Sequence, residues 1–325
     1  MVVVVPRRPS LVGWIRIKCA VTGFENMKEM QGYVLITVAS ILWGTLGILA
    51  KLSFEHGVLP ETLIALRLVI SFATLSAVLA IFSKDSFKVK KTDALLFLIF
   101  GVFATALQRI SYFYTVDLTT VTVAAILFYT YPVFVTISAS LFLKEKITSR
   151  ELLAIILTFS GAALVAKVYD SSSLKVNLIG IIFGLLSSLL FTLYFMMTKK
   201  LRNRYTSWTL TLYGDGIGVL TLTPVISLSI PQIINFPLQL WLLIFTIAWI
   251  PSLLAYLLYS YALKYVKASK GSILSVIEPL SAALFSTIFI GENLENPQIV
   301  GIALALIGVA LLFQMKQKRI TRGSE

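Results

Sequence analysis

Ten long apolar runs constrain this chain more than any other feature of its sequence. They cover approximately residues 32–53, 60–83, 94–115, 121–143, 149–168, 177–198, 207–230, 238–263, 269–290 and 295–315. A bilayer core about 30 Å thick requires roughly 20 mostly apolar residues for each helical span. Because 58% of the residues are hydrophobic and only 13% are charged, the pattern predicts an all-α integral membrane protein with ten transmembrane helices. Only short loops separate the runs, so no soluble domain is expected.

The lysines and arginines between the runs indicate the direction of the spans. Positive residues stay on the cytoplasmic side of a membrane. One side receives only Lys51, Lys167 and Lys175, while Arg67 and Arg109 lie inside spans. The other basic residues gather at both termini and in the even-numbered loops. Both termini are therefore predicted to be cytoplasmic, in a multi-pass protein of the cell membrane. This distribution explains the formal net charge of +13 without nucleic acid as a partner.

Residues 1–31 are predicted to form an N-terminal cytoplasmic tail. Arg16 and Lys18 interrupt the only apolar stretch of this segment, and no small-residue cleavage site follows it, so it is neither a span nor a typical signal peptide. Translation that starts at Met27 or Met30, directly before the first run, is the alternative. Residues 316–325 are predicted to form a basic cytoplasmic tail.

The chain contains an internal repeat. FLKEKITSRE at residues 142–151 returns as FIGENLENPQ at residues 289–298, an offset of 147 residues. This offset carries five runs, an odd number, so the second copy enters the membrane from the opposite face. The chain is therefore divided into two inverted-topology five-helix repeats, residues 32–168 and residues 177–315. Residues that are identical at this offset include Tyr114 and Tyr261, Pro132 and Pro279, Glu145 and Glu292, and Gly161 and Gly308.

The inversion explains why only the first of the two loops is basic. The loop of FLKEKITSRE is expected on the cytoplasmic side and keeps Lys144, Lys146 and Arg150, whereas the loop at residues 291–298 is expected on the other side. The shared Glu145 and Glu292 lie at span ends, where a helix cap or a contact to a neighbouring helix is expected.

Three stretches resemble EamA-type proteins of the drug/metabolite transporter (DMT) superfamily. They are LWG at residues 42–44, with Lys51 at the end of the first run, FYTVDLTTVTVAAILFYTYPVFVTISASLFLKEKIT at residues 113–148, and YALKYVKASKGSILSVIEPLSAALFSTIFIGENL at residues 261–294. The resemblance covers about residues 32–315. It implies a central cavity between the first four helices of each half, with the fifth and tenth helices packed outside. Relatives of this type export amino acids and metabolites or move sugar phosphates and nucleotide sugars.

Four ionisable residues inside the predicted spans are the main site candidates, because such groups cost several kcal/mol in hydrocarbon unless they face a cavity or a partner. Arg67 and Arg109 are expected on the outer side of the midplane, Asp215 slightly to the inner side and Glu278 near the centre. Either arginine could bind a substrate carboxylate or phosphate through its planar guanidinium group. Alternatively, the arginines pair with the two acids in buried salt bridges, or Arg67 reaches the outer surface.

The two acids are candidates for binding an amine or a coupling proton. Glu278 precedes Pro279, which frees a backbone carbonyl in the preceding turn. Asp215 lies in YGDGIG, whose glycines permit close helix packing, and packing alone is the alternative role for this segment. Pro132 and Pro279 are predicted to kink the fourth and ninth spans and to act as hinges. Five aromatic residues are candidates to line the cavity: Trp43, Tyr112, Tyr129, Tyr131 and Tyr256.

The sequence argues against redox, metal and ATP chemistry. Cys19 and His56 are the only residues of their types, and no Walker-type phosphate-binding motif is present. No catalytic residue, metal or cofactor is therefore predicted.

The leading hypothesis is a secondary transporter that exports a small polar metabolite, an amino acid or a related compound, by alternating access. Alternatives are an antiporter of phosphorylated metabolites or nucleotide sugars, an integral membrane enzyme acting on lipid, and a non-transporting scaffold. A coupling proton and a homodimer are left open as partners.

Overall fold

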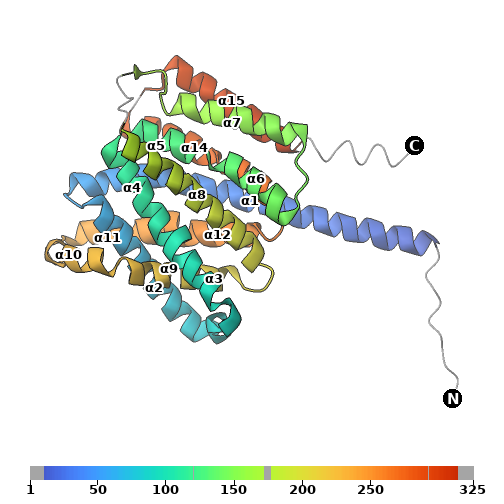
Figure 1. Cartoon of the computed structure of the whole chain (residues 1–325), viewed down its shortest axis with the longest axis horizontal. Coiled ribbons are helices and arrows are strands. Elements are labelled where there is room, and N and C mark those ends of the chain that lie inside the picture. The colour runs from blue at the N-terminus through green and yellow to red at the C-terminus, as the bar shows by residue number, and fades with distance from the viewer. Residues whose placement is uncertain (1–10, 120, 172–176, 292, 314–325) are drawn as a thin grey trace.

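The computed structural model describes residues 11–119, 121–171, 177–291 and 293–313, and every regular element in this part of the chain is helical (Figure 1). The first half contains α1 (Leu11–Glu55), α2 (Pro60–Phe82), the short turns η1 (Lys84–Phe87) and η2 (Lys91–Asp93), α3 (Ala94–Ile99), η3 (Phe100–Leu107), α4 (Gln108–Leu118), α5 (Val121–Phe128), α6 (Tyr131–Leu143) and α7 (Ser149–Val165). The second half contains α8 (Leu178–Leu201), α9 (Ser207–Thr221), α10 (Thr223–Ile233), α11 (Leu238–Ile247), η5 (Ala248–Leu254), α12 (Ala255–Ala262), α13 (Ala268–Leu274), α14 (Ile277–Phe285), η6 (Ser286–Ile290) and α15 (Asn296–Phe313).

Helices occupy all ten runs that the sequence predicts, but fewer of them meet the length of a membrane span. Within the described residues, seven helices are long and apolar enough to cross a membrane, and the pair α9 and α10, bent by 76°, brings the number to eight. The helix α7 has only 17 residues, and the apolar part of α15 is similarly short. The chain is therefore an all-α membrane protein.

Three predicted segments fall partly or wholly outside the described residues. The backbone of α1 is helical from Leu11, within the predicted N-terminal tail, and its first part extends beyond the bundle (Figure 1). The side chains of residues 11–26, the tail at residues 316–325 and Glu292 lie outside the part of the chain that the structure describes.

The starts of α7 and α15 carry matching caps. Thr148 Oγ1 accepts a hydrogen bond from the Glu151 backbone N–H at 3.2 Å, and the Glu151 carboxylate accepts one from the Thr148 N–H at 2.8 Å. At the repeat offset, the Glu295 N–H donates to Gln298 Oε1 at 3.0 Å. The pair at α7 is a reciprocal cap, and both caps satisfy N–H groups that a helix start leaves unpaired. The repeat is thus visible in the local hydrogen bonding as well as in the sequence.

The helices α7 and α15 pack side by side at the edge of the bundle (Figure 1). Glycine permits this contact: a Cβ atom on Gly161 would lie 2.5 Å from the carbonyl oxygen of Gly301, and one on Gly301 would lie 2.7 Å from the carbonyl oxygen of Gly161. Gln298 Nε2 also donates to the Val165 carbonyl at 3.0 Å and connects the two helices. Because α7 and α15 lie at the edge, the other helices surround the centre of the protein.

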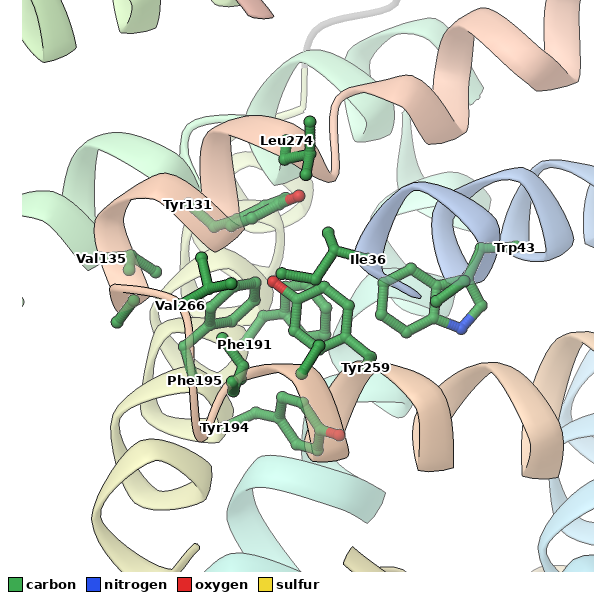
Figure 2. Close-up of a cluster of buried hydrophobic side chains, with 14 of the residues drawn as sticks. Ile36, Trp43, Tyr131, Val135, Phe191, Tyr194, Phe195, Tyr259, Val266 and Leu274 are labelled. Carbon is green, nitrogen blue, oxygen red and sulfur yellow. The ribbon is translucent and has the colours of Figure 1, made fainter. Parts of the chain in front are cut away.

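A cluster of aromatic side chains fills the space between α1, α6, α8 and α12 (Figure 2). Tyr131 and Tyr259 are fully buried in it. The ring centroids of Tyr131 and Phe191 lie 4.9 Å apart with perpendicular rings, and those of Trp43 and Tyr259 lie 5.0 Å apart. Each such aromatic pair adds about 0.5–1.5 kcal/mol beyond the burial of its area. The cluster therefore closes this part of the bundle with dense packing.

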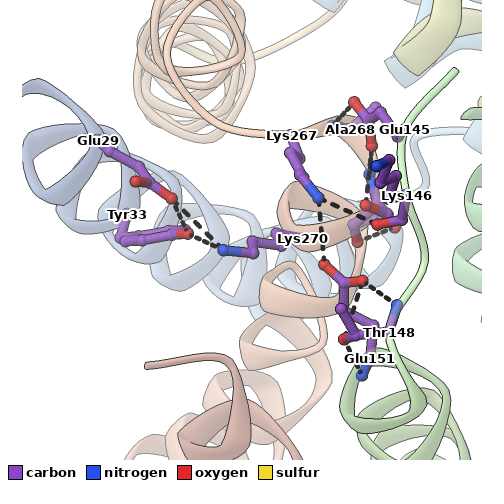
Figure 3. A network of polar contacts seen from close by, with 11 residues as sticks. Glu29, Tyr33, Glu145, Lys146, Thr148, Glu151, Lys267, Ala268 and Lys270 are labelled. Atoms are coloured by element: carbon purple, nitrogen blue, oxygen red, sulfur yellow. Dashed lines mark hydrogen bonds and ion pairs between the residues drawn. The ribbon is translucent and has the colours of Figure 1, made fainter. Parts of the chain in front are cut away.

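A polar network holds the start of α13 to the loop before α7 (Figure 3). The Glu145 carboxylate accepts hydrogen bonds from the backbone N–H groups of Ala268 and Ser269 at 3.0 and 3.3 Å, and from Ser269 Oγ at 2.8 Å. Lys267 Nζ donates to the Lys146 carbonyl at 3.1 Å and lies 3.9 Å from Glu151 Oε1. Glu145 is therefore a helix cap that joins the two halves, as its position at a span end suggests.

Candidate functional site

The four ionisable residues predicted from the sequence form one group in the centre of the bundle. They come from α2 (Arg67), α4 (Arg109), α9 (Asp215) and α14 (Glu278). Arg67 interacts electrostatically with the other three, and Arg109 interacts with Asp215. Within the described residues, none of the four belongs to an ion pair. Three of them, Arg67, Arg109 and Asp215, instead form hydrogen bonds with neutral groups.

Arg67 is held by a hydroxyl group. Its Nε donates to Ser252 Oγ of η5 at 2.8 Å, and Ser252 Oγ donates in turn to the Ile247 carbonyl at 2.9 Å. The side chain is half-buried. Only one of the three guanidinium nitrogens takes part in this bond, so the other two keep their N–H groups for a further acceptor.

Arg109 lies against an aromatic ring. Its Nη1 donates to the Thr105 carbonyl at 2.7 Å, and its Cζ is 4.9 Å from the centroid of the Tyr256 ring. This geometry is a cation–π contact, which attracts a guanidinium through the ring quadrupole. Arg109 and Tyr256 are both half-buried, so the contact leaves part of each side chain accessible.

Two π-helical segments place these residues. The segment η3 ends at Leu107, shortly before Arg109, and η5 ends at Leu254, shortly before Tyr256. The repeat offset of 147 residues places η5 on η3 and Tyr256 on Arg109. Single π-helical turns are rare and frequently lie at functional sites. The repeat therefore brings two equivalent positions into contact at the centre of the protein.

Asp215 is buried, with 8% of its surface exposed. Ser71 Oγ of α2 donates to its Oδ2 at 2.5 Å. The glycines around it make the close contacts that the YGDGIG motif predicts: a Cβ atom on Gly214 would lie 2.9 Å from the Phe100 ring, and one on Gly216 would lie 2.6 Å from the Phe72 ring. The YGDGIG segment therefore combines close helix packing with a buried carboxyl group.

Glu278 is half-buried near the start of α14 and, within the described residues, has neither a side-chain hydrogen bond nor an ion pair. Its charge interacts with Arg67 and with the hydroxyl groups of Tyr112 and Tyr129. The close packing of Gly44 of α1 fixes its backbone, because a Cβ atom on Gly44 would lie 2.9 Å from the Glu278 carbonyl oxygen. Its carboxylate therefore remains available to a ligand.

The helices that carry Pro132 and Pro279 are interrupted just before each proline. α5 ends at Phe128 and α6 begins at Tyr131, while α13 ends at Leu274 and α14 begins at Ile277. These breaks are equivalent at the repeat offset. A proline in the first turn of a helix needs no N–H partner, so both prolines fit their positions. Their role as hinges stays a prediction.

The predicted aromatic residues divide into two groups. Trp43, Tyr129 and Tyr131 are buried, the first and third inside the aromatic cluster of Figure 2. Tyr112 and Tyr256 are half-buried beside the charged residues. Their rings pack on Phe128 at 5.2 Å and on Trp43 at 5.1 Å. The second group provides an apolar wall next to Arg109 and Glu278.

Sequence reasoning missed Ser71 and Ser252, which bond to two of the four charges. Serine is common in membrane helices, where its hydroxyl usually bonds to its own helix. Pro251 in η5 was the available signal, because an internal proline disturbs a helix.

A separate cavity of about 200 Å³ contains none of the predicted site residues; it is lined by Lys167, Ala283, Ser286, Thr287, Asn293, Leu294 and Gln298. No group of three potential metal ligands occurs in the described part of the chain.

Comparison with known proteins gives consistent matches along the chain. The model of the EamA-like transporter family matches residues 30–167 and again residues 178–314. An uncharacterized transporter of Archaeoglobus fulgidus is 31% identical over 284 residues, which are 87% of this chain and 96% of the relative. The uncharacterized transporter YxxF of Bacillus subtilis is 26% identical over 298 residues, which are 90% of this chain and 93% of the relative.

A solved crystal structure has a similar arrangement of helices. It matches with a TM-score of 0.73 and 14% sequence identity, over 88% of this chain and 98% of its own chain. At this low identity the likeness shows the fold alone.

Proposed function

Because this chain belongs to the EamA-like transporter family, we propose that it is a secondary transporter of a small polar metabolite, an amino acid or a related zwitterion. One observation carries the proposal. Arg67 lies within electrostatic range of Arg109, Asp215 and Glu278, and none of these four groups belongs to an ion pair within the described residues. A substrate with one charge of each sign complements such a site.

The remaining N–H groups of the two arginines and the carboxylate of Glu278 indicate how a zwitterion would bind. Arg67 commits one nitrogen to Ser252, and Arg109 commits one nitrogen to the Thr105 carbonyl. Their other N–H groups match the two oxygens of a carboxylate. Glu278 is the acceptor for the substrate ammonium group. The half-buried rings of Tyr112 and Tyr256 are the surface for its apolar part.

The topology that we propose has ten spans in two inverted repeats, with both termini in the cytoplasm. The distribution of Lys and Arg supports this orientation, and α1 begins on the side of the bundle where α15 ends (Figure 1). The matching helix breaks and π-helical segments of the two halves support alternating access, in which equivalent elements exchange conformations. Export is the proposed direction, and Glu278 or Asp215 is the proposed carrier of a coupling proton.

Reconstitution into liposomes tests the proposal. Uptake and counterflow are measured with labelled amino acids, sugar phosphates and cationic drugs, alongside the variants Arg109→Gln and Glu278→Gln. We expect counterflow of at least one amino acid, its loss in Arg109→Gln, and reduced but measurable counterflow in Glu278→Gln. Flux of none of these compounds in folded protein, as judged by thermal unfolding, contradicts the proposal and favours a lipid enzyme or a scaffold.

An antiporter of phosphorylated metabolites is the second candidate. The two arginines favour it, because guanidinium groups bind phosphate as readily as carboxylate. The presence of Glu278 and Asp215 in the same group argues for the zwitterion, since a carboxylate repels a phosphate. Counterflow of sugar phosphate against inorganic phosphate, without flux of amino acids, would favour the antiporter over the transporter of a zwitterion.

A further inference from the structure

Ser252 connects a helix irregularity to a charged residue of the site. It lies in the π-helical segment η5 directly after Pro251. Its hydroxyl donates to the Ile247 carbonyl five residues earlier, at 2.9 Å, and accepts from Arg67 Nε at 2.8 Å. Only 7% of Ser252 is exposed. The hydroxyl therefore has both a defined donor and a defined acceptor in a buried position.

Proline explains why the hydroxyl is placed there. In an α-helix the Ile247 carbonyl would accept from the N–H of residue 251, four positions later, but proline has no N–H. A π-helical turn instead pairs residues five positions apart, which brings residue 252 to the Ile247 carbonyl. Once its proton is directed to that carbonyl, the Ser252 oxygen presents its lone pairs to Arg67. The orientation of the hydroxyl is thus determined by the backbone.

The other half of the repeat lacks this contact. At the repeat offset, Thr105 of η3 corresponds to Ser252, and Gly214 corresponds to Arg67. A Cβ atom on Gly214 would lie 3.2 Å from Thr105 Oγ1, so the two backbones approach at the equivalent place without any guanidinium group. The hydrogen bond between Ser252 and Arg67 is therefore present in only one of the two repeats, and the centre of the protein is asymmetric at this position.

We propose that Ser252 is a positioning residue that orients the Arg67 guanidinium toward the anionic end of the substrate. This proposal rests on the proposed function, because it assigns Arg67 to substrate binding. Ser252 itself does not contact the substrate. By holding Nε, it restricts rotation of the guanidinium group, whose two terminal nitrogens have no hydrogen-bond partner within the described residues. Without the hydroxyl, the guanidinium loses its defined orientation, and the substrate must order it upon binding.

Transport kinetics separate positioning from a structural role. The probe is tritium-labelled L-leucine in proteoliposomes, with the variants Ser252→Ala and Ser252→Thr. Loss of a hydrogen bond to a charged group corresponds to about a tenfold change in affinity. We therefore expect Ser252→Ala to raise KM about tenfold with little change in kcat, and Ser252→Thr, which retains a hydroxyl, to restore KM. Thr246→Ala is the matched control, because within the described residues that hydroxyl bonds only to the Leu242 carbonyl of its own helix.

A chemical readout tests the orientation of Arg67 without transport. Phenylglyoxal modifies accessible guanidinium groups, and mass spectrometry measures its rate at Arg67 against the exposed Arg204. We expect faster modification of Arg67 in Ser252→Ala than in wild type, Ser252→Thr or Thr246→Ala. In the Arg67→Gln background, Ser252→Ala should no longer change KM, because the residue that it orients is absent.

The two readouts distinguish the possible failures. An unchanged rate of Arg67 modification in Ser252→Ala overturns the positioning role, whatever the transport result. A raised rate without any flux of leucine or the other compounds of the panel supports the positioning role and contradicts the proposed function. A fall in kcat at constant KM, with Thr as poor as Ala, overturns the proposal in favour of a purely structural role.

Discussion

Arg109 lies over the ring of Tyr256, with its Cζ 4.9 Å from the ring centroid, and the two residues occupy equivalent positions in the two halves of the repeat. An inverted repeat related by an axis in the membrane plane brings equivalent positions together near the midplane. A mutation at one of these positions therefore acts on the same contact as a mutation at the other.

The cation–π contact should contribute to substrate affinity. We expect Tyr256→Leu to raise KM about three- to tenfold, because a cation–π contact contributes about 0.5–2 kcal/mol and orients the guanidinium. Tyr256→Phe preserves the ring and should remain close to wild type. Equal losses in the Leu and Phe variants would show that the hydroxyl, rather than the ring, is required. The measurement is the initial rate of uptake against substrate concentration.

The Glu278 carboxyl group should connect transport to protons. It is half-buried and, within the described residues, has no hydrogen-bonding partner, so a proton can exchange with a substrate at this place. We expect an imposed pH gradient to change the flux of the wild type and to have no effect on Glu278→Gln, which cannot ionise. Counterflow at equal pH on both sides controls for substrate binding. A wild-type flux that does not respond to the gradient would remove the proton from the mechanism.

The Glu145 cap should stabilise the fold. Glu145→Ala removes three hydrogen bonds to the start of α13. Loss of a helix cap typically costs about 0.5–2 kcal/mol, and we expect a lower midpoint of thermal unfolding in detergent. Arg150→Ala, at an exposed position in the first turn of α7, is the control for loss of a charge. Equal midpoints for the wild type and Glu145→Ala would contradict the role of the cap.

The contact between α7 and α15 should give stability a defined dependence on pH. Lys167 Nζ and the Tyr169 hydroxyl donate to the Glu295 carboxylate at 2.7 and 2.8 Å. These bonds lower the pKa of Glu295. The ionised group therefore stabilises the folded state above its ordinary pKa of about 4.3, and this stabilisation is lost as the pH falls through the lower, folded-state pKa.

Thermal unfolding of Glu295→Gln measures this dependence. We expect the wild type to be slightly more stable than the variant above about pH 5 and the two to converge in more acidic solution. The effect should be small, because the side chains of Lys167 and Glu295 are 39% and 49% exposed and water screens such pairs. A difference that grows as the pH falls would have the wrong sign for a carboxylate with a lowered pKa.

Local sequence predicted the helices well. The apolar runs, the interruptions before Pro132 and Pro279 and the close packing of YGDGIG correspond to elements of the structure. Each depends on the residues of one segment: apolar length, a missing N–H or a missing Cβ. The same information predicted ten spans, whereas seven helices of the described residues, or eight with the bent pair α9 and α10, are long enough to cross a membrane, because α7 and α15 are short.

By itself, the sequence determined the helical character of this protein, its membrane environment and the residues whose charges cannot face lipid. It did not determine what those charges contact. Only the tertiary structure decided that Ser252 holds Arg67, that Ser71 holds Asp215 and that Tyr256 covers Arg109. The physical reason is that these partners are far apart in the chain and meet only when the two halves pack. Polar side chains in a membrane select partners by distance and orientation, which no single segment encodes.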